Sequence, residues 1–229
     1  MLSVLLIFDR NILYMKKLLL LFALLPYIAL SQVKDIDGNS YHSIKIGKQE
    51  WMVENLNVKH YRNGDPINEV QAPKKWIKTD KKAQPAWCYF DNNPENGEKY
   101  GKLYNYYAIN DPRGLAPAGW HIPTEDEWKI LIDYLGGELE SGNKLKSTTN
   151  WFSGGSGSDE SGFTALSGGA RSHDASFQHH KIGYYSYWWS SSEYNATLAW
   201  YRYLSFNSSV LKFDFGLKNH GLYVRCIKD

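Results

Sequence analysis

The sequence predicts an α+β fold, in which small antiparallel sheets and long loops accompany one amphipathic helix at about 124–135. Three observations support this prediction. Short alternating segments in the first third are separated by turn signals such as Asp37-Gly38 and Asn63-Gly64. A capping sequence precedes the one segment with helical spacing of apolar residues. The last third alternates apolar and polar residues in the manner of a β-meander.

The length and composition are those of a globular protein. A chain of 229 residues has room for one large domain or two small ones. Its 43% apolar and 15% aromatic residues exclude disorder over the whole length. Three of the 26 basic and one of the 24 acidic residues lie in the first 31 positions, which leaves 23 of each in the remainder. This balance gives no electrostatic reason to expect nucleic acid or an anionic membrane surface as a partner.

Residues 1–31 resemble a secretory signal peptide. Met15-Lys16-Lys17 is a basic start, residues 18–30 are apolar, and Ala29-Leu30-Ser31 is a small-x-small cleavage site before Gln32. We expect translation to begin at Met15, because the preceding residues fit no part of a signal peptide. The alternative is an uncleaved membrane anchor, although the apolar run is short for a span. The mature chain has no other segment of spanning length, so we expect no integral membrane segment in it, and a compartment in which disulfides form.

Strands and loops are expected to alternate over the first half of the mature chain. Residues 33–67 read as small antiparallel strands, and residues 68–85 as a long, lysine-rich surface loop. Strand-like aromatic segments resume at 86–90 and at 103–109, separated by the turn-rich residues 91–97.

The helix at about 124–135 carries clear boundary signals. Thr124 followed by Glu127 is a capping box, and Gly136-Gly137 ends the pattern. A shorter helical stretch is expected before Lys146, and the Gly/Ser-rich residues 153–162 are expected to form a flexible loop. Apolar residues with helical spacing lie between the two boundaries: Trp128, Leu131, Ile132 and Leu135.

The C-terminal third is predicted to be a three-stranded meander of residues 198–206, 210–215 and 222–226. Alternation along 198–206 predicts that Trp200 and Leu204 face the core and that Tyr201 and Tyr203 face away from it. Arg202 interrupts the apolar face, so we expect it at the sheet edge or paired with a carboxylate.

Eight short phrases, in order along nearly all of the mature chain, resemble the Fibrobacter succinogenes major paralogous domain. They are DIDGNxY (35–41), IGxQxWMxxNL (46–56), WCY (87–89), GKLYN (101–105), GWHxPT (119–124), ESGF (160–163), WWSSS (188–192) and VRC (224–226). The resemblance implies a single domain over 32–229, a C-type-lectin-like fold distantly similar to the formylglycine-generating sulfatase-modifying enzymes, and a secreted or cell-surface protein of a Gram-negative bacterium. It implies no established activity, and a binding role follows only by analogy with lectin-like scaffolds.

The two cysteines do not match the chemistry of the sulfatase-modifying enzymes, which need a close pair. Cys88 and Cys226 are 138 positions apart, each among apolar neighbours. They are either a structural disulfide or two buried thiols.

Other candidate sites lack the required surroundings. Ser172-His173-Asp174 and His179-His180 have neither the glycine-flanked serine of a nucleophile elbow nor a recognisable set of metal-ligand separations. We therefore expect them to be solvated loop histidines. The acidic pair Asp159-Glu160 could hold a structural calcium through oxygen ligands, but no cofactor or metal is expected.

An aromatic, Ser- and Asn-rich segment between residues 183 and 207 is the strongest functional signal. Tyrosine mixed with serine and asparagine is typical of rigid, hydrated binding surfaces. Trp188, Trp189 and Trp200 are expected in the core. The candidate ligand-binding residues are Tyr185, Tyr187, Tyr194, Tyr201 and Tyr203.

These observations favour an exported, non-catalytic binding module whose ligand is a glycan or a protein. One alternative is a hydrolytic enzyme with a non-standard site built from His173, Asp174 and neighbouring carboxylates, which requires that these groups converge in a pocket. The other alternative is a purely structural surface protein, which would expose no aromatic patch.

We predict that the exported protein begins at Gln32, because the basic, apolar and small-residue segments occur in the order that signal peptidase recognises. Intact-mass spectrometry of the exported protein measures its N-terminus directly. Retention of Met1 or Met15 would contradict the prediction.

Overall fold

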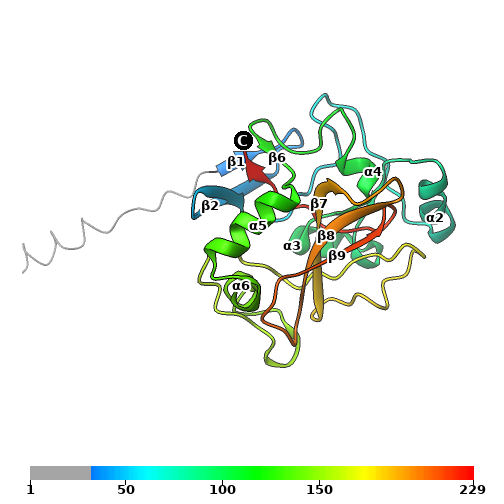
Figure 1. Ribbon diagram of the computed structural model, residues 1–229. Coiled ribbons are helices and arrows are strands. Elements are labelled where there is room, and N and C mark those ends of the chain that lie inside the picture. The colour runs from blue at the N-terminus through cyan, green and yellow to red at the C-terminus, as the bar shows by residue number, and fades with distance from the viewer. Residues whose placement is uncertain (1–31) are drawn as a thin grey trace, which may run out of the picture. The chain divides into compact units, whose positions relative to one another are not determined.

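Three antiparallel sheets and five α-helices form the part of the chain described by the computed structural model, residues 32–229 (Figure 1). The leader predicted at residues 1–31 lies outside the described residues. The fold class is α+β, as the sequence predicts.

The largest sheet joins the two ends of the described chain. Its strand order is β1-β2-β3-β10-β6, and all pairings are antiparallel. Ile227 lies opposite both Trp51 and His121, so the last strand lies inside the sheet and not at its edge. The strands expected within residues 33–67 are therefore confirmed. The bounds are β1 (Gln32–Lys34), β2 (Ser40–Ile46), β3 (Gln49–Met52), β6 (Trp120–His121) and β10 (Ile227–Lys228).

A second, two-stranded sheet pairs β4 (Trp87–Cys88) with β5 (Leu103–Tyr104). The connection contains the 3₁₀ turn Phe90–Asn92 and α3 (Pro94–Tyr100). The expected strand at 103–109 is only partly correct, because α4 (Tyr106–Ile109) begins directly after β5. Asn105 caps α4 by accepting a hydrogen bond from the Ala108 amide, which stops the strand at this point.

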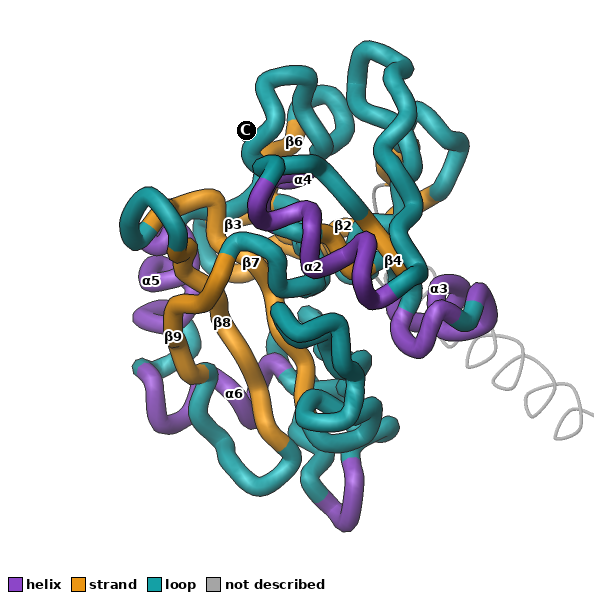
Figure 2. The backbone as a smooth tube through the Cα atoms, turned by 90° about the vertical axis from the view of Figure 1, so that its right-hand side faces the viewer, coloured by secondary structure: helices purple, strands orange, loops and turns teal. Residues whose placement is uncertain are grey.

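The prediction of a loop at 68–85 is wrong, since α2 (Pro73–Lys81) lies within it (Figure 2). Its inner face is small: Trp76 and Thr79 are its only buried residues. The Trp76 indole donates to the Asn219 carbonyl at 2.8 Å, and the Arg171 guanidinium lies 4.4 Å from the Trp76 ring centroid. A single tryptophan anchors α2, and the rest of the helix surface is lysine-rich. The sequence therefore shows no row of apolar residues at helical spacing.

The main helix, α5 (Glu125–Tyr134), has the predicted capping box. The Glu127 amide donates to Thr124 Oγ1 at 3.3 Å, and the Thr124 amide donates to Glu127 Oε2 at 2.8 Å. Its buried face packs Trp128 against Trp51, with ring centroids 4.8 Å apart. The shorter helix expected before Lys146 is α6 (Glu138–Leu145).

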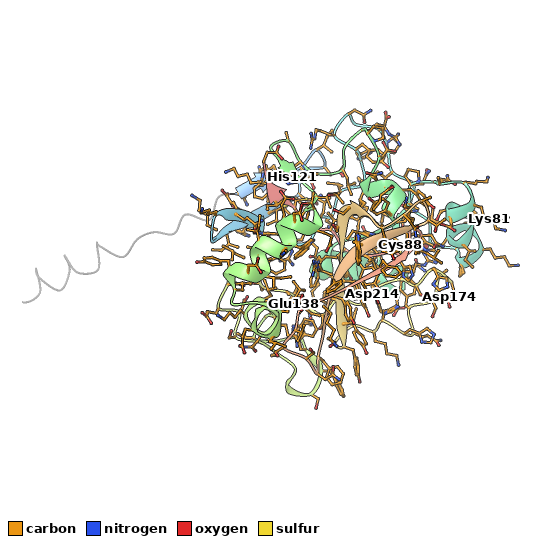
Figure 3. The ribbon with its side chains drawn as sticks, viewed as in Figure 1. Lys81, Cys88, His121, Glu138, Asp174 and Asp214 are labelled. Atoms are coloured by element: carbon orange, nitrogen blue, oxygen red, sulfur yellow. The ribbon has the colours of Figure 1, made fainter. Side chains whose placement is uncertain are left out.

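His121, labelled in Figure 3, connects α5 to the C-terminal end of the chain. Its Nε2 is 2.7 Å from Glu127 Oε1, and its Nδ1 is 2.7 Å from Asp229 Oδ1. Burial alone would lower the pKa of His121, but the two carboxylates raise it above its usual value.

The structure has a three-stranded meander in the C-terminal third, in which two of the predicted strands, 198–206 and 210–215, are confirmed, while the predicted third strand at 222–226 is wrong. It consists of β7 (Tyr185–Glu193), β8 (Leu198–Ser205) and β9 (Lys212–Leu217), side by side in Figure 2. Residues 222–226 form only isolated bridges, with Tyr104 and Trp188, before the chain enters β10. Every residue of 222–226 is buried, so its apolar pattern reflects burial on all sides and not a half-buried strand.

The Gly/Ser-rich residues 153–162, expected to be flexible, contain glycines packed closely against their neighbours. A Cβ on Gly155 would lie 2.2 Å from the Phe206 carbonyl oxygen, and one on Gly157 would lie 2.2 Å from that of Asn143. The glycines here allow close backbone approach rather than free motion.

Two hydrophobic clusters lie on opposite sides of the strands. Adjacent residues of β7 supply both: Trp188 packs in the cluster with Trp51 and Trp128, and Trp189 packs in the cluster with Tyr104. Trp188 and Trp189 are core residues, as predicted.

A buried polar hub, formed by Asn55, Trp188 and Arg225, joins distant segments. Asn55 Oδ1 accepts from Trp188 Nε1 at 2.8 Å and from the Arg225 guanidinium at 2.9 and 3.1 Å. Asn55 Nδ2 donates to the Tyr100 carbonyl at 2.8 Å. Arg225 also donates to the Phe163 carbonyl, and its guanidinium lies 4.2 Å from the Phe163 ring centroid. Burial lowers the pKa of Arg225 to about 9, so the group is still charged at neutral pH.

We predict that Asn55→Ala lowers the free energy of unfolding by about 3–5 kcal/mol, because it leaves a buried guanidinium and an indole N–H without their acceptor. Urea denaturation monitored by tryptophan fluorescence measures the loss. The control is Asn207→Ala, at an exposed turn position, which should change stability by no more than about 0.5 kcal/mol. Equal effects of the two substitutions would show that the hub does not stabilise the fold.

Candidate binding surfaces

Four of the five candidate tyrosines lie together on one face of the three-stranded sheet, here called the tyrosine face. Tyr187 is 5.9 Å from Tyr185, 5.9 Å from Tyr201 and 5.4 Å from Tyr203, measured between ring centroids. Tyr187 is only 6% exposed, so the expectation that it is exposed is wrong. Tyr185, Tyr201 and Tyr203 are half-buried and pack against the cluster that contains Trp189, so the expectation that Tyr201 and Tyr203 face away from the core is wrong. The tyrosine face is thus largely an aromatic packing layer.

Three neighbouring histidines lie beside the tyrosine face, and His180 contacts it directly. His180 Nδ1 lies 2.8 Å from the Tyr187 hydroxyl, and the His220 ring centroid lies 5.2 Å from that of His173. Burial, together with repulsion from His173 and His180, lowers the pKa of His220 to about 3, and burial lowers the pKa of His180 as well. Both rings are therefore neutral at pH 7.

The residues proposed for a hydrolytic site belong to an exposed loop. His173, Asp174 and His179 are all exposed, and Asp174 Oδ1 accepts from the Ser176 amide at 2.9 Å. Asp174 is labelled at the periphery of the molecule in Figure 3.

The oxygens of Asp159, considered above for calcium, have protein partners. They accept from the amide and the hydroxyl of Thr164, each at 2.8 Å. Among residues 32–229, no group of three or more His, Cys, Asp or Glu side chains is arranged to hold a metal ion.

The opposite face of the same sheet carries an exposed aromatic patch, formed by Tyr194, Trp200, Phe213 and Phe215. Tyr194 stacks on Phe215 with 4.1 Å between ring centroids, and the Trp200 ring lies 5.0 Å from Tyr194 and 6.0 Å from Phe213. The exposed fractions are 51% for Phe213, 45% for Tyr194 and 39% for Phe215.

At this patch the structure corrects two predictions made from the sequence. Trp200 is half-buried and belongs to neither cluster, so its assignment to the core is wrong, whereas Leu204 is fully buried as predicted. Tyr194 lies with Trp200 and not with the other four tyrosines. Phe213 and Phe215 were not among the candidates. Their signal in the sequence is two phenylalanines at i and i+2, separated by Asp214 in a short strand.

A hollow of about 370 Å³ lies between the aromatic patch and α5. Glu125 and Lys129 line it from the helix, and Trp200, Arg202 and Phe213 line it from the sheet. The Arg202 guanidinium forms an ion pair with Glu125, which confirms the predicted carboxylate partner. Arg202 lies on the central strand, so its expected alternative at the sheet edge does not apply.

A second hollow, of about 320 Å³, lies beside the polar hub. Its buried polar groups already have protein partners: Asn55 and Arg225 bond to each other, and the Tyr41 hydroxyl donates to Asp35 Oδ2 at 2.6 Å. These polar groups have little hydrogen-bonding capacity left for a ligand.

Cys88 and Cys226 are free, fully buried thiols. Of the two alternatives, a structural disulfide and two buried thiols, the structure has the second. Cys88 belongs to the cluster around Trp188 and Cys226 to the cluster around Trp189. Burial raises the pKa of each thiol to about 12.

The family model described as the Fibrobacter succinogenes major domain matches residues 44–228. The chain belongs to this family. Comparison with curated proteins and with solved structures finds no match. In this Fibrobacter succinogenes major domain, the short sequences that carry the resemblance supply all three residues of the polar hub, Asn55, Trp188 and Arg225, and also Phe163, whose carbonyl accepts from Arg225. No helix within residues 32–229 is long and apolar enough to cross a membrane.

We predict that the native protein shows no thiol reactive towards Ellman's reagent at pH 7–8, because both thiols are buried and their pKa values are raised to about 12. After denaturation without reductant, two thiols per chain should react. The absence of reactive thiols after denaturation would show that Cys88 and Cys226 form a disulfide.

Proposed function

We propose that this domain is an exported, non-catalytic binding module of a bacterial cell surface or periplasm, with a glycan or a protein as its ligand. The observation that carries the proposal is the exposed aromatic patch of Tyr194, Trp200, Phe213 and Phe215 beside the hollow at α5. Large aromatic side chains held outward on a rigid sheet give contact area at a low entropy cost.

The aromatic patch supports binding better than the tyrosine face does. Phe213 and Phe215 lie on the edge strand β9, and their rings face solvent, whereas Tyr187 is buried beneath its neighbours. The exposed part of a ring at the surface contributes little to the stability of the fold. Such exposure is typical of surfaces that become covered by a partner.

Export is supported by the leader, and the balanced charge of the remainder bears on the kind of ligand. Residues 15–31 have the order of a signal peptide, and residues 32–229 carry 23 acidic and 23 basic residues. A neutral surface with an aromatic patch suits recognition by contact and hydrogen bonding rather than by long-range attraction.

The test is binding of the purified protein to glycan and protein arrays, followed by titration calorimetry with the best ligand. Phe213→Ala should weaken that binding about 30-fold, since truncation of a central aromatic contact costs about 2 kcal/mol. The matched control is Tyr134→Ala, an aromatic side chain 64% exposed on α5 and outside the patch, which should leave the affinity unchanged.

A third variant compares the two faces of the sheet. Tyr203→Ala changes the tyrosine face and leaves the aromatic patch intact, so it should not affect binding. Loss of binding in Tyr203→Ala, with Phe213→Ala unaffected, would move the ligand to the tyrosine face. Absence of any array ligand would contradict the proposed function.

A further inference from the structure

The hollow between α5 and the three-stranded sheet contains an ion pair with unused hydrogen-bonding capacity. Arg202 is only 6% exposed and pairs through one terminal nitrogen with Glu125 Oε2. Arg202 Nε and Glu125 Oε1 have no hydrogen-bond partner. A buried donor and a buried acceptor left unpaired are costly, and here they lie on the same two side chains.

The unpaired atoms restrict the chemistry of a ligand. The Arg202 Nε–H can only donate, and the Glu125 carboxylate oxygen can only accept. A ligand carboxylate or phosphate would satisfy Arg202 but would be repelled by Glu125. A ligand ammonium would satisfy Glu125 but would be repelled by Arg202. A hydroxyl group both donates and accepts, so neighbouring hydroxyls satisfy both atoms without a charge conflict.

The walls of the hollow favour a ligand that also has apolar faces. Trp200 and Phe213 line it on the sheet side, and the Arg202 guanidinium lies 5.1 Å from the Phe213 ring centroid. Lys129 and Asp133, both exposed, stand at the helix side with opposite charges, and Glu138, labelled in Figure 3, also lines the hollow. A volume of about 370 Å³ lies within the range of small-ligand sites.

We propose that this hollow binds one ring of a neutral sugar. Neighbouring hydroxyls of the ring donate to the Glu125 carboxylate and accept from Arg202, and its C–H face packs on Trp200 and Phe213. The Glu125 side chain lines the hollow and keeps 21% of its surface exposed, whereas its Oε1 atom and Arg202 Nε are covered by protein. Both side chains therefore have to rotate towards the hollow to meet the hydroxyls of the ring. This inference rests on the proposed function and names the ligand class of the same surface.

The test uses calorimetric titration of the purified protein with methyl glycosides of three classes: neutral hexoses, uronic acids and amino sugars. Neutral hexosides should bind, and Glu125→Gln should weaken their binding at least 10-fold, because an amide cannot replace both oxygen acceptors. The matched control is Asp126→Asn, which removes the same charge from the neighbouring exposed position of α5 and should change the affinity less than 2-fold. Thermal unfolding of each variant shows that the fold is intact.

Three results would overturn the inference while leaving the proposed function standing. They are binding of uronic acids or amino sugars alone, binding of neutral sugars that is lost in Phe213→Ala but unchanged in Glu125→Gln, and an array ligand that is a protein. The absence of any ligand on either array would instead overturn the proposed function itself.

Discussion

The structure depends on the burial of one arginine, Arg225. A buried guanidinium requires acceptors, and Asn55 provides them while it also accepts from Trp188. The aromatic ring of Phe163 covers the charge. These residues lie far apart in the sequence. The hydrogen bonds that Arg225 requires therefore hold together the segment after β3, the loop at 160–163, β7 and the segment before β10.

The family phrases and the candidate ligand surface occupy different parts of the molecule. Asn55, Trp188 and Arg225 belong to the phrases and are buried, whereas Trp200, Phe213 and Glu125 lie outside them and border solvent. Membership of the family therefore accounts for the scaffold and does not identify the ligand. The two groups do touch: Glu125 directly follows the Thr124 cap of α5, so the scaffold fixes the position of the carboxylate in the hollow.

Features with local chemical causes could be predicted from the sequence, and features set by tertiary contacts could not. The capping box at Thr124 determines where α5 begins, and the turn signals located the small strands. Helix α2 was missed because a single contact, of Trp76 with Asn219, replaces an apolar face. Alternation along β8 correctly separated Tyr201 and Tyr203 from Leu204. Alternation could not show that Leu204 is buried and Trp200 borders solvent, although both lie on the same face of β8. This difference depends on how far α5 extends over the sheet.

The position of β10 has a consequence for how the domain forms. Its Ile227 pairs with Trp51 on one side and His121 on the other, so the place between β3 and β6 stays vacant until residues near the end of the domain have been synthesised. Until then β3 and β6 each present an unpaired edge, which is the feature that invites pairing with other chains. Contacts across such long sequence separations also form slowly. A nascent domain of this kind therefore spends a period open to aggregation, and its yield in a cell should depend on chaperones that shield these two edges until the final strand arrives.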